Sequence, residues 1–182
     1  MVTNQSDALH VEGLVNLRDL GGLPIRGGGD TTRFGRLLRS DSPHHLDESG
    51  VRALADAGVS TVVDLRTASE RADRPNLLVS VEEIQCIHAP IFTDDTEFPG
   101  ELTTATDVYT WWLRDLGTGI KAAMTAIAEA PSAPVLVHCH AGKDRTGVVV
   151  ALALLLAGVD AGAIADDYAL SGVQLADMLA RD

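Results

Sequence analysis

The sequence predicts an α/β domain of three layers, in which helices cover both faces of a central, mainly parallel sheet. Two observations carry this prediction. Short β-branched strands alternate with helical stretches along the chain, and the segment 135–138 is apolar until its last residue. Continuous apolar strands are typical of parallel sheets, because both of their faces are covered. Such sheets bind ligands beyond the carboxyl ends of their strands.

The amino-terminal third predicts a small hairpin followed by a helix and a strand. Strands are expected at three places: 14–20, 23–25 and 34–39. The glycine-rich segment 27–30 is the expected turn between the last two. The stretch 47–57 has helical apolar spacing and ends at Gly58, and the β-branched run 59–63 predicts the next strand.

The rest of the chain continues this alternation. It predicts in order a strand, a polar loop, two helices, a buried strand and a further helix: 84–91, 93–100, 102–116, 120–130, 135–138 and the stretch after Arg145. The apolar run 148–159 is too short for the roughly 20 residues that span a bilayer, so it is interpreted as a buried helix. Without internal repeats, residues 1–182 are expected to form one domain, with 1–12 flexible.

Composition excludes several classes of partner and site. The 182 residues carry 26 acidic and 14 basic side chains, a formal charge of −12, which disfavours nucleic acid and stable membrane association. The two cysteines, Cys86 and Cys139, suit neither a disulfide scaffold nor a zinc site, so no metal or cofactor is expected. A reducing compartment and the lack of a secretory signal at the start predict a cytoplasmic protein. The oligomeric state stays open.

Cys139 and Arg145 bracket a short loop between the strand 135–138 and the following helix. Such a loop can curl so that its backbone N–H groups bind an anion, and the helix amino terminus adds positive potential. Gly142 permits the tight curl, while Arg145 offers a planar fork for two phosphoryl oxygens. These groups favour a nucleophilic thiolate. The sequence therefore predicts attack by Cys139 on a phosphate monoester, with a phosphocysteine intermediate that water hydrolyses.

The segment 138–147 reads His-Cys-x-x-Gly-Lys-x-Arg-Thr-Gly and resembles the signature of the protein tyrosine phosphatase superfamily. Similarity to the atypical bacterial dual-specificity branch is found at four further places: 16–22, 35–40, 63–66 with Glu70, and 167–171. The resemblance implies the cysteine phosphatase fold and hydrolysis of phosphotyrosine, sometimes of phosphoserine or phosphothreonine, and in several members of phosphoinositides. The expected partner is a phosphorylated protein or a phosphoinositide.

The resemblance also implies roles for the loop residues. The substrate-binding set is His140, Ala141, Gly142, Lys143, Asp144 and Arg145. Expulsion of the leaving group needs a general acid. The branch implies Asp144, whereas Asp94 and Asp95 are rivals because they lie in a polar loop where a movable acid would sit. Lys143 resembles the lysine of phosphatases that accept phosphoinositides, although it could simply attract phosphate.

Several residues near the loop are expected to support the nucleophile or the fold. Thr146 could hydrogen-bond the thiolate, and His138 could steady the loop from the strand. Ion pairs and caps are expected from five charged residues: Arg18, Asp19, Asp64, Arg66 and Glu70. Cys86 is expected to pack in the core, with a redox role toward Cys139 as the alternative. Two remote alternatives are a rhodanese-like sulfurtransferase, which gives no reason for His138 or Thr146, and a non-catalytic phosphate-binding module.

Overall fold

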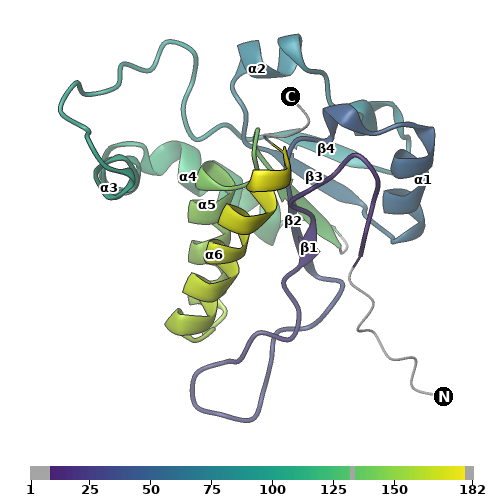
Figure 1. Cartoon of the computed structure of the whole chain (residues 1–182), viewed down its shortest axis with the longest axis horizontal. Coiled ribbons are helices and arrows are strands. Elements are labelled where there is room, and N and C mark those ends of the chain that lie inside the picture. Colours follow the sequence, from purple (N-terminus) through teal and green to yellow (C-terminus); the bar gives the residue numbers. More distant parts are fainter. Residues whose placement is uncertain (1–8, 132–133, 179–182) are drawn as a thin grey trace.

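A five-stranded sheet forms the centre of the computed structural model, which describes residues 9–131 and 134–178 (Figure 1). The strands lie in the order β1-β2-β5-β3-β4, and only β1 runs antiparallel to its neighbour. Their bounds are β1 (Arg18–Asp19), β2 (Leu37–Ser40), β3 (Thr61–Asp64), β4 (Gln85–His88) and β5 (Val135–His138). The predicted α/β fold with a mainly parallel sheet is confirmed.

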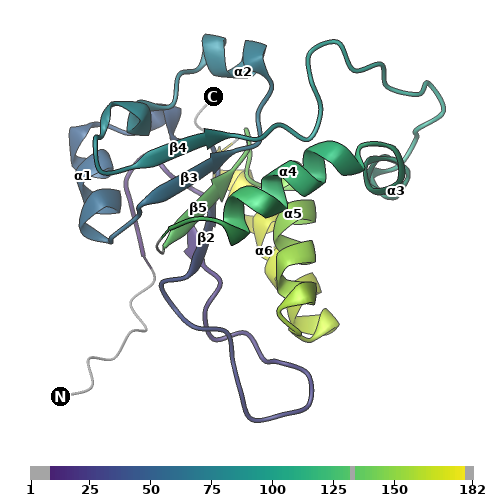
Figure 2. The same ribbon diagram turned by 180° about the vertical axis from the view of Figure 1, so that it is seen from behind.

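Helices cover both faces of this sheet, and Figure 2 shows the strands between α1 on one side and α4 and α5 on the other. The helices are α1 (Glu48–Asp56), α2 (Ala68–Asp73), α3 (Ala105–Asp115), α4 (Gly117–Ala128), α5 (Asp144–Leu156) and α6 (Ala161–Met178). The three predicted layers are therefore present. Among the described residues, no helix is both long and apolar enough to cross a membrane.

The two sides of the sheet belong to different apolar clusters, because neighbouring side chains of a strand point to opposite faces. Val62 and Leu136 pack in the cluster that contains Leu54 of α1. Val63 and Val137 pack in the cluster of α3, α4 and α5. All four strand residues are fully buried. The continuous apolar strand 135–138 is explained by this double coverage.

The amino-terminal hairpin is shorter than predicted. Of the expected strand 14–20, only Arg18–Asp19 pairs with β2. The backbone N–H groups of residues 15–16 donate to the Asp41 carboxylate instead of to a neighbouring strand. The expected strand 23–25 forms no ladder in the described chain and makes only isolated bridges, Pro24 with Thr31 and Ile25 with Val159.

The remaining elements agree with those predicted from the sequence, apart from two additional helices. The helices expected at 47–57, 102–116 and 120–130 are α1, α3 and α4, and the buried strand 135–138 is β5. The helices α2 and α6 were not predicted. Of the segment 1–12, residues 1–8 lie outside the described part of the chain.

Candidate active site

The loop that follows β5 is fixed by hydrogen bonds to three of its backbone carbonyl oxygens. The Asn16 side chain donates to Ala141 O at 2.9 Å, and Arg39 Nη2 donates to Gly142 O at 2.7 Å. The third carbonyl, that of His140, accepts from the backbone N–H of Ser42 at 2.8 Å. We call these three contacts the loop brace. It comes from the chain before β1 and from the end of β2, far away in sequence.

Arg39 is the central member of the loop brace. Its side chain is only 1% exposed, and its guanidinium forms a 2.7 Å ion pair with Asp167 of α6. Asp167 also binds Arg18 at 2.6 Å, which confirms the expected pairing of Arg18. The buried or nearly buried charges of Arg18, Arg39 and Asp167 thus link β1, β2 and α6 next to the loop.

Gly142 adopts a conformation that only glycine tolerates here. Its φ is +69°, and a Cβ atom at this position would lie 2.2 Å from the carbonyl oxygen of Ser40. The predicted tight curl is therefore present. Helix α5 begins at Asp144, two residues earlier than expected, so its first N–H groups, which lack intrahelical acceptors, lie within the loop itself.

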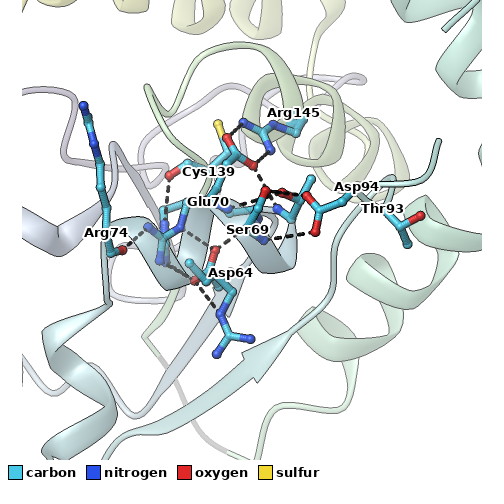
Figure 3. A network of polar contacts seen from close by, with 12 residues as sticks. Asp64, Ser69, Glu70, Arg74, Thr93, Asp94, Cys139 and Arg145 are labelled. Carbon is cyan, nitrogen blue, oxygen red and sulfur yellow. Dashed lines mark hydrogen bonds and ion pairs between the residues drawn. The ribbon is translucent and has the colours of Figure 1, made fainter. Parts of the chain in front are cut away.

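The Arg145 side chain is held from the other side, by Glu70 of α2. The guanidinium donates through Nη1 and Nη2 to the two Glu70 oxygens at 2.5 and 2.7 Å (Figure 3). Burial would lower the pKa of Arg145, but Glu70 and the nearby Cys139 raise it. Burial likewise opposes ionisation of Glu70, yet the hydrogen bonds from Arg145 and Thr67 outweigh it and lower its pKa. Among the described residues, Glu70 engages two of the five N–H donors of Arg145, which leaves three for an anion.

Glu70 is itself positioned by a capping box. It is the third residue of α2, where its carboxylate accepts from the backbone N–H of Thr67, while the Thr67 hydroxyl accepts from the backbone N–H of Glu70. The guanidinium carbon of Arg145 also lies over the ring of Phe92, 5.2 Å from the ring centroid. The sequence identified Glu70 as an ion-pair residue but did not predict that its partner is Arg145.

Cys139 and its neighbours are buried at the end of β5. Cys139 is 3% exposed, and Thr146 is fully buried with a hydroxyl that has no hydrogen-bond partner among the described residues. His138 is also fully buried, with Nδ1 3.0 Å from Cys139 O and Nε2 3.4 Å from Asn76. Burial lowers the pKa of His138, which keeps its ring neutral. His138 thus contacts the backbone of the nucleophile from the strand, and its role in steadying the loop stays a prediction.

The three candidate acids lie in different surroundings. Asp144 accepts a hydrogen bond from Tyr109 of α3 at the amino end of α5. Asp94 is engaged elsewhere, because its oxygens accept from the hydroxyl and the backbone N–H of Ser69 at 2.5 and 3.0 Å (Figure 3). Hydrogen bonds from Ser69 and then Thr67 lower the pKa of Asp94. Asp95 is exposed.

The remaining loop side chains lie at its edge. His140 is half-buried, and its Nε2 is 3.3 Å from Nη1 of Arg74. Burial and then Arg74 lower the pKa of His140. Lys143 is partly exposed, as is Ala141. No sequence pattern singles out Arg39, Tyr109 or Arg74, although Arg39 lies in a segment that resembles the family.

Cys86 packs against the cluster around α1, as expected. Its register partner on β3 is Val62, which pairs on its other side with Leu136, so two strand spacings separate Cys86 from β5. This is roughly 9.6 Å, whereas a disulfide needs Cα atoms within about 7 Å. Burial and then Asp64 raise the pKa of Cys86 to about 11. The distance from β5 and the raised pKa of the thiol both favour a packing role for Cys86 over disulfide formation with Cys139.

The family profile described as "Tyrosine phosphatase family" matches residues 9–182. The chain is 37% identical over 143 residues to a tyrosine-protein phosphatase of Nostoc commune, covering 74% of this chain and 48% of that protein. It is 32% identical over 180 residues to the triple specificity protein phosphatase PtpB of Mycobacterium tuberculosis, covering 82% and 65%. A solved structure of P. aeruginosa TpbA in complex with pTyr has a TM-score of 0.42 and 21% identity, covering 73% and 67%.

This chain spans about half to two thirds of the length of the curated relatives that it matches. The family profile nevertheless extends from the chain before β1 to the end of α6 and beyond, and includes both the phosphate loop and the loop brace. A match over nearly the whole sequence, on the fold that the loop requires, establishes that the chain belongs to the tyrosine phosphatase family.

Proposed function

We propose that this protein hydrolyses phosphate monoesters through a phosphocysteine intermediate on Cys139, and that its substrates are proteins phosphorylated on tyrosine, with dual specificity for phosphoserine and phosphothreonine. The observation that carries this proposal is the fixed loop from Cys139 to Arg145. Its carbonyl oxygens are engaged by the loop brace, and its far end is the amino terminus of α5. Such a loop presents backbone N–H groups and positive potential to a bound phosphate.

In the first step, the Cys139 sulfur attacks phosphorus as the bond to the leaving oxygen breaks. Arg145 binds two equatorial oxygens, because Glu70 holds its planar fork in place while leaving three N–H donors free. The buried Thr146 hydroxyl would donate to the sulfur and stabilise it as the leaving group of the second step, in which water attacks phosphorus.

Asp144 is the general acid in this proposal. It lies within the loop next to Arg145, whereas both oxygens of Asp94 accept hydrogen bonds from Ser69. Those bonds occupy both oxygens of Asp94, which suits an anchor of the 93–100 segment better than a proton donor, whereas Asp144 accepts hydrogen bonds from the described residues at Oδ1 alone. Asp144 would donate a proton to the leaving oxygen and then accept one from the attacking water.

Phosphotyrosine is the preferred substrate class, and the names of similar proteins support it. The similar N. commune protein is named a tyrosine-protein phosphatase, and the similar M. tuberculosis protein is named for triple specificity. Phosphoinositides are the alternative substrate, because the partly exposed Lys143 could bind an additional phosphate at the loop edge. We infer no other partner.

Turnover of three substrates by the wild type and by Cys139→Ser tests this proposal. The panel consists of a phosphotyrosine peptide, a phosphoserine peptide and a soluble phosphoinositide. We expect phosphate release from the tyrosine peptide by the wild type, and none above background from Cys139→Ser. Turnover that survives in Cys139→Ser would contradict the proposed nucleophile. A preference for the phosphoinositide would replace the substrate class but leave the reaction unchanged.

A further inference from the structure

Two tyrosine hydroxyls meet at the carboxylate of Asp144, and they come from two different helices. Tyr109 of α3 donates its hydroxyl proton to Asp144 Oδ1. The hydroxyl oxygen of Tyr168, from α6, lies 2.7 Å from that of Tyr109 and 3.5 Å from Asp144 Oδ1. These are the only two tyrosines in the sequence. We call the three residues the tyrosine–aspartate cluster.

Packing fixes both rings in this cluster. The Tyr109 ring contacts Trp112, with 5.4 Å between centroids, and Trp112 is itself buried in the core. The Tyr168 ring lies against the backbone of Gly147, where a Cβ atom would be only 2.7 Å from a ring carbon. Glycine at 147 therefore allows Tyr168 to approach α5 close to Asp144. Burial, and then the bond to Asp144, raise the pKa of Tyr109, so its hydroxyl keeps its proton and remains a donor.

We propose that Tyr109, supported by Tyr168, is a positioning residue for the general acid: it holds Asp144 Oδ1 so that Oδ2 carries the proton to the leaving group. This inference rests on the proposed role of Asp144. The geometry that carries it is the convergence of both hydroxyls on one carboxylate oxygen. The other oxygen of Asp144 accepts no hydrogen bond among the described residues that would compete for this task.

The bond from Tyr109 changes strength during proton transfer. As the bond between phosphorus and the leaving oxygen breaks, the proton on Asp144 Oδ2 moves to that oxygen and negative charge develops on the carboxylate. A hydrogen bond to an ionised acceptor is stronger than one to a neutral acceptor, so Tyr109 stabilises this transition state more than the ground state. In the second step the carboxylate takes a proton from the attacking water, so the negative charge on Asp144 disappears and the hydrogen bond from Tyr109 weakens again.

A purely structural role predicts a different kinetic result. If the hydroxyls only joined α3, α5 and α6, their removal would lower turnover of all substrates by the same factor. A positioning role acts only where the leaving group needs a proton. Aryl phosphates with progressively more basic leaving phenols separate the two cases, because an activated phenol such as para-nitrophenol needs little help.

The test measures kcat/KM along this aryl phosphate series for Tyr109→Phe. We expect a loss of about tenfold with the most basic phenol and little loss with para-nitrophenyl phosphate, which makes the dependence on leaving-group basicity steeper. Tyr168→Phe should change the slope less, since its hydroxyl is farther from Asp144. Thr110→Val is the control: it removes an exposed hydroxyl from the same helix, outside the tyrosine–aspartate cluster, and it should leave the slope unchanged.

The same series in an Asp144→Asn background separates this inference from the proposed function. Asp144→Asn should itself steepen the dependence strongly, and adding Tyr109→Phe should then change the slope no further. A uniform loss in Tyr109→Phe, or an additional slope change in the double variant, would overturn the positioning role and leave Asp144 as the acid. If Asp144→Asn did not steepen the dependence on leaving-group basicity, both the positioning role of Tyr109 and the role of Asp144 as general acid would be overturned. Cys139→Ser would still test the nucleophile independently.

A spectroscopic measurement reports on the contact without turnover. Because the sequence has two tyrosines, a protein labelled with ¹³C at the tyrosine ζ carbon gives two signals. Replacing Asp144 by Ala should shift the Tyr109 signal, since its hydroxyl loses a carboxylate acceptor, whereas Asp94→Ala should shift neither signal. An unchanged Tyr109 signal in Asp144→Ala would contradict the hydrogen bond on which the inference rests.

Discussion

The phosphate loop is held on two sides by contacts of opposite character. On the side of β2 and α6, the loop brace holds backbone carbonyls through Arg39, whose side chain is 1% exposed. On the side of α2, Glu70 holds the side chain of Arg145, and this carboxylate is 30% exposed. Buried charges cost much when they lose a partner, and exposed ones cost little. The shape of the loop and its chemistry should therefore be separable by mutation.

The largest effect on stability is expected from Arg39→Met. The substitution removes a hydrogen bond to the loop and one of the two cations that neutralise Asp167, and we expect a loss of about 3–5 kcal/mol in the free energy of unfolding. Urea denaturation followed by fluorescence measures this loss. Arg52→Met is the matched control, because Arg52 forms an exposed 3.9 Å pair with Glu48. Equal stability of the two variants would contradict a buried brace.

Arg145→Lys should damage chemistry and leave the fold almost intact. A lysine cannot reproduce the planar fork toward the phosphate, so we expect kcat to fall by roughly 10²–10³. The midpoint of thermal unfolding should change little. Arg114→Lys alters an exposed arginine that pairs with Asp115, and it should match the wild type in both measurements. Near-normal turnover by Arg145→Lys would show that bidentate binding is not required.

Glu70→Gln should have a smaller effect, again on activity. Losing the charge loosens the Arg145 fork, and we expect kcat/KM to fall about tenfold, in line with roughly 1.5 kcal/mol for a hydrogen bond between charged groups. The pH dependence gives a second check. Because the folded-state pKa of Glu70 lies below its ordinary value of 4.5, its stabilising effect is present at neutral pH and lost on acidification below that value.

The stability difference between wild type and Glu70→Gln should therefore shrink as the pH falls from about 4.5 through the lowered folded-state pKa of Glu70. Urea titrations at pH 7 and at pH 3.5 measure it. A difference as large at pH 3.5 as at pH 7 would mean that the carboxylate charge is not what holds Arg145. Glu48→Gln, whose side chain is 97% exposed, provides the comparison at both pH values.

The smallest effect is expected from Asp94→Asn. An anchor of the 93–100 segment can be replaced by an amide with little loss, so kcat/KM for a phosphate with a basic leaving group should stay within about threefold of the wild type. Asp95→Asn should do the same. A hundredfold loss in either variant would transfer the role of general acid from Asp144 to that residue.

The nucleophile loop could be predicted from sequence because its residues are neighbours in the chain. The strand 135–138 is apolar up to its last residue, and Gly142 marks the curl that follows it. Helix α2 was not predicted because the residues of segment 68–73 are either polar or small and form no apolar face. The capping box stabilises this helix instead. Helix α6 is rich in alanine and glycine, so it lacks a clear apolar period.

Contacts that join distant segments could not be predicted from one sequence. Nothing local to Arg39 indicates that it is buried, since charged side chains are nearly always exposed and its ion-pair partner Asp167 lies 128 positions later. The pairing of Glu70 with Arg145 and that of Tyr109 with Asp144 are of the same kind. The sequence resemblance found several of these positions, while the structure supplies their physical partners.

The most direct test of the proposed chemistry is to trap the phosphorylated enzyme. Wild type and Asp144→Asn would be mixed with an activated aryl phosphate, quenched within milliseconds and digested, and the peptides would be analysed by mass spectrometry. We predict a phosphoryl group on the peptide that contains Cys139, with more of it in Asp144→Asn, where water attack is slowed. Turnover with no phosphorylated Cys139 peptide, or with phosphate on another side chain, would contradict covalent catalysis by this cysteine.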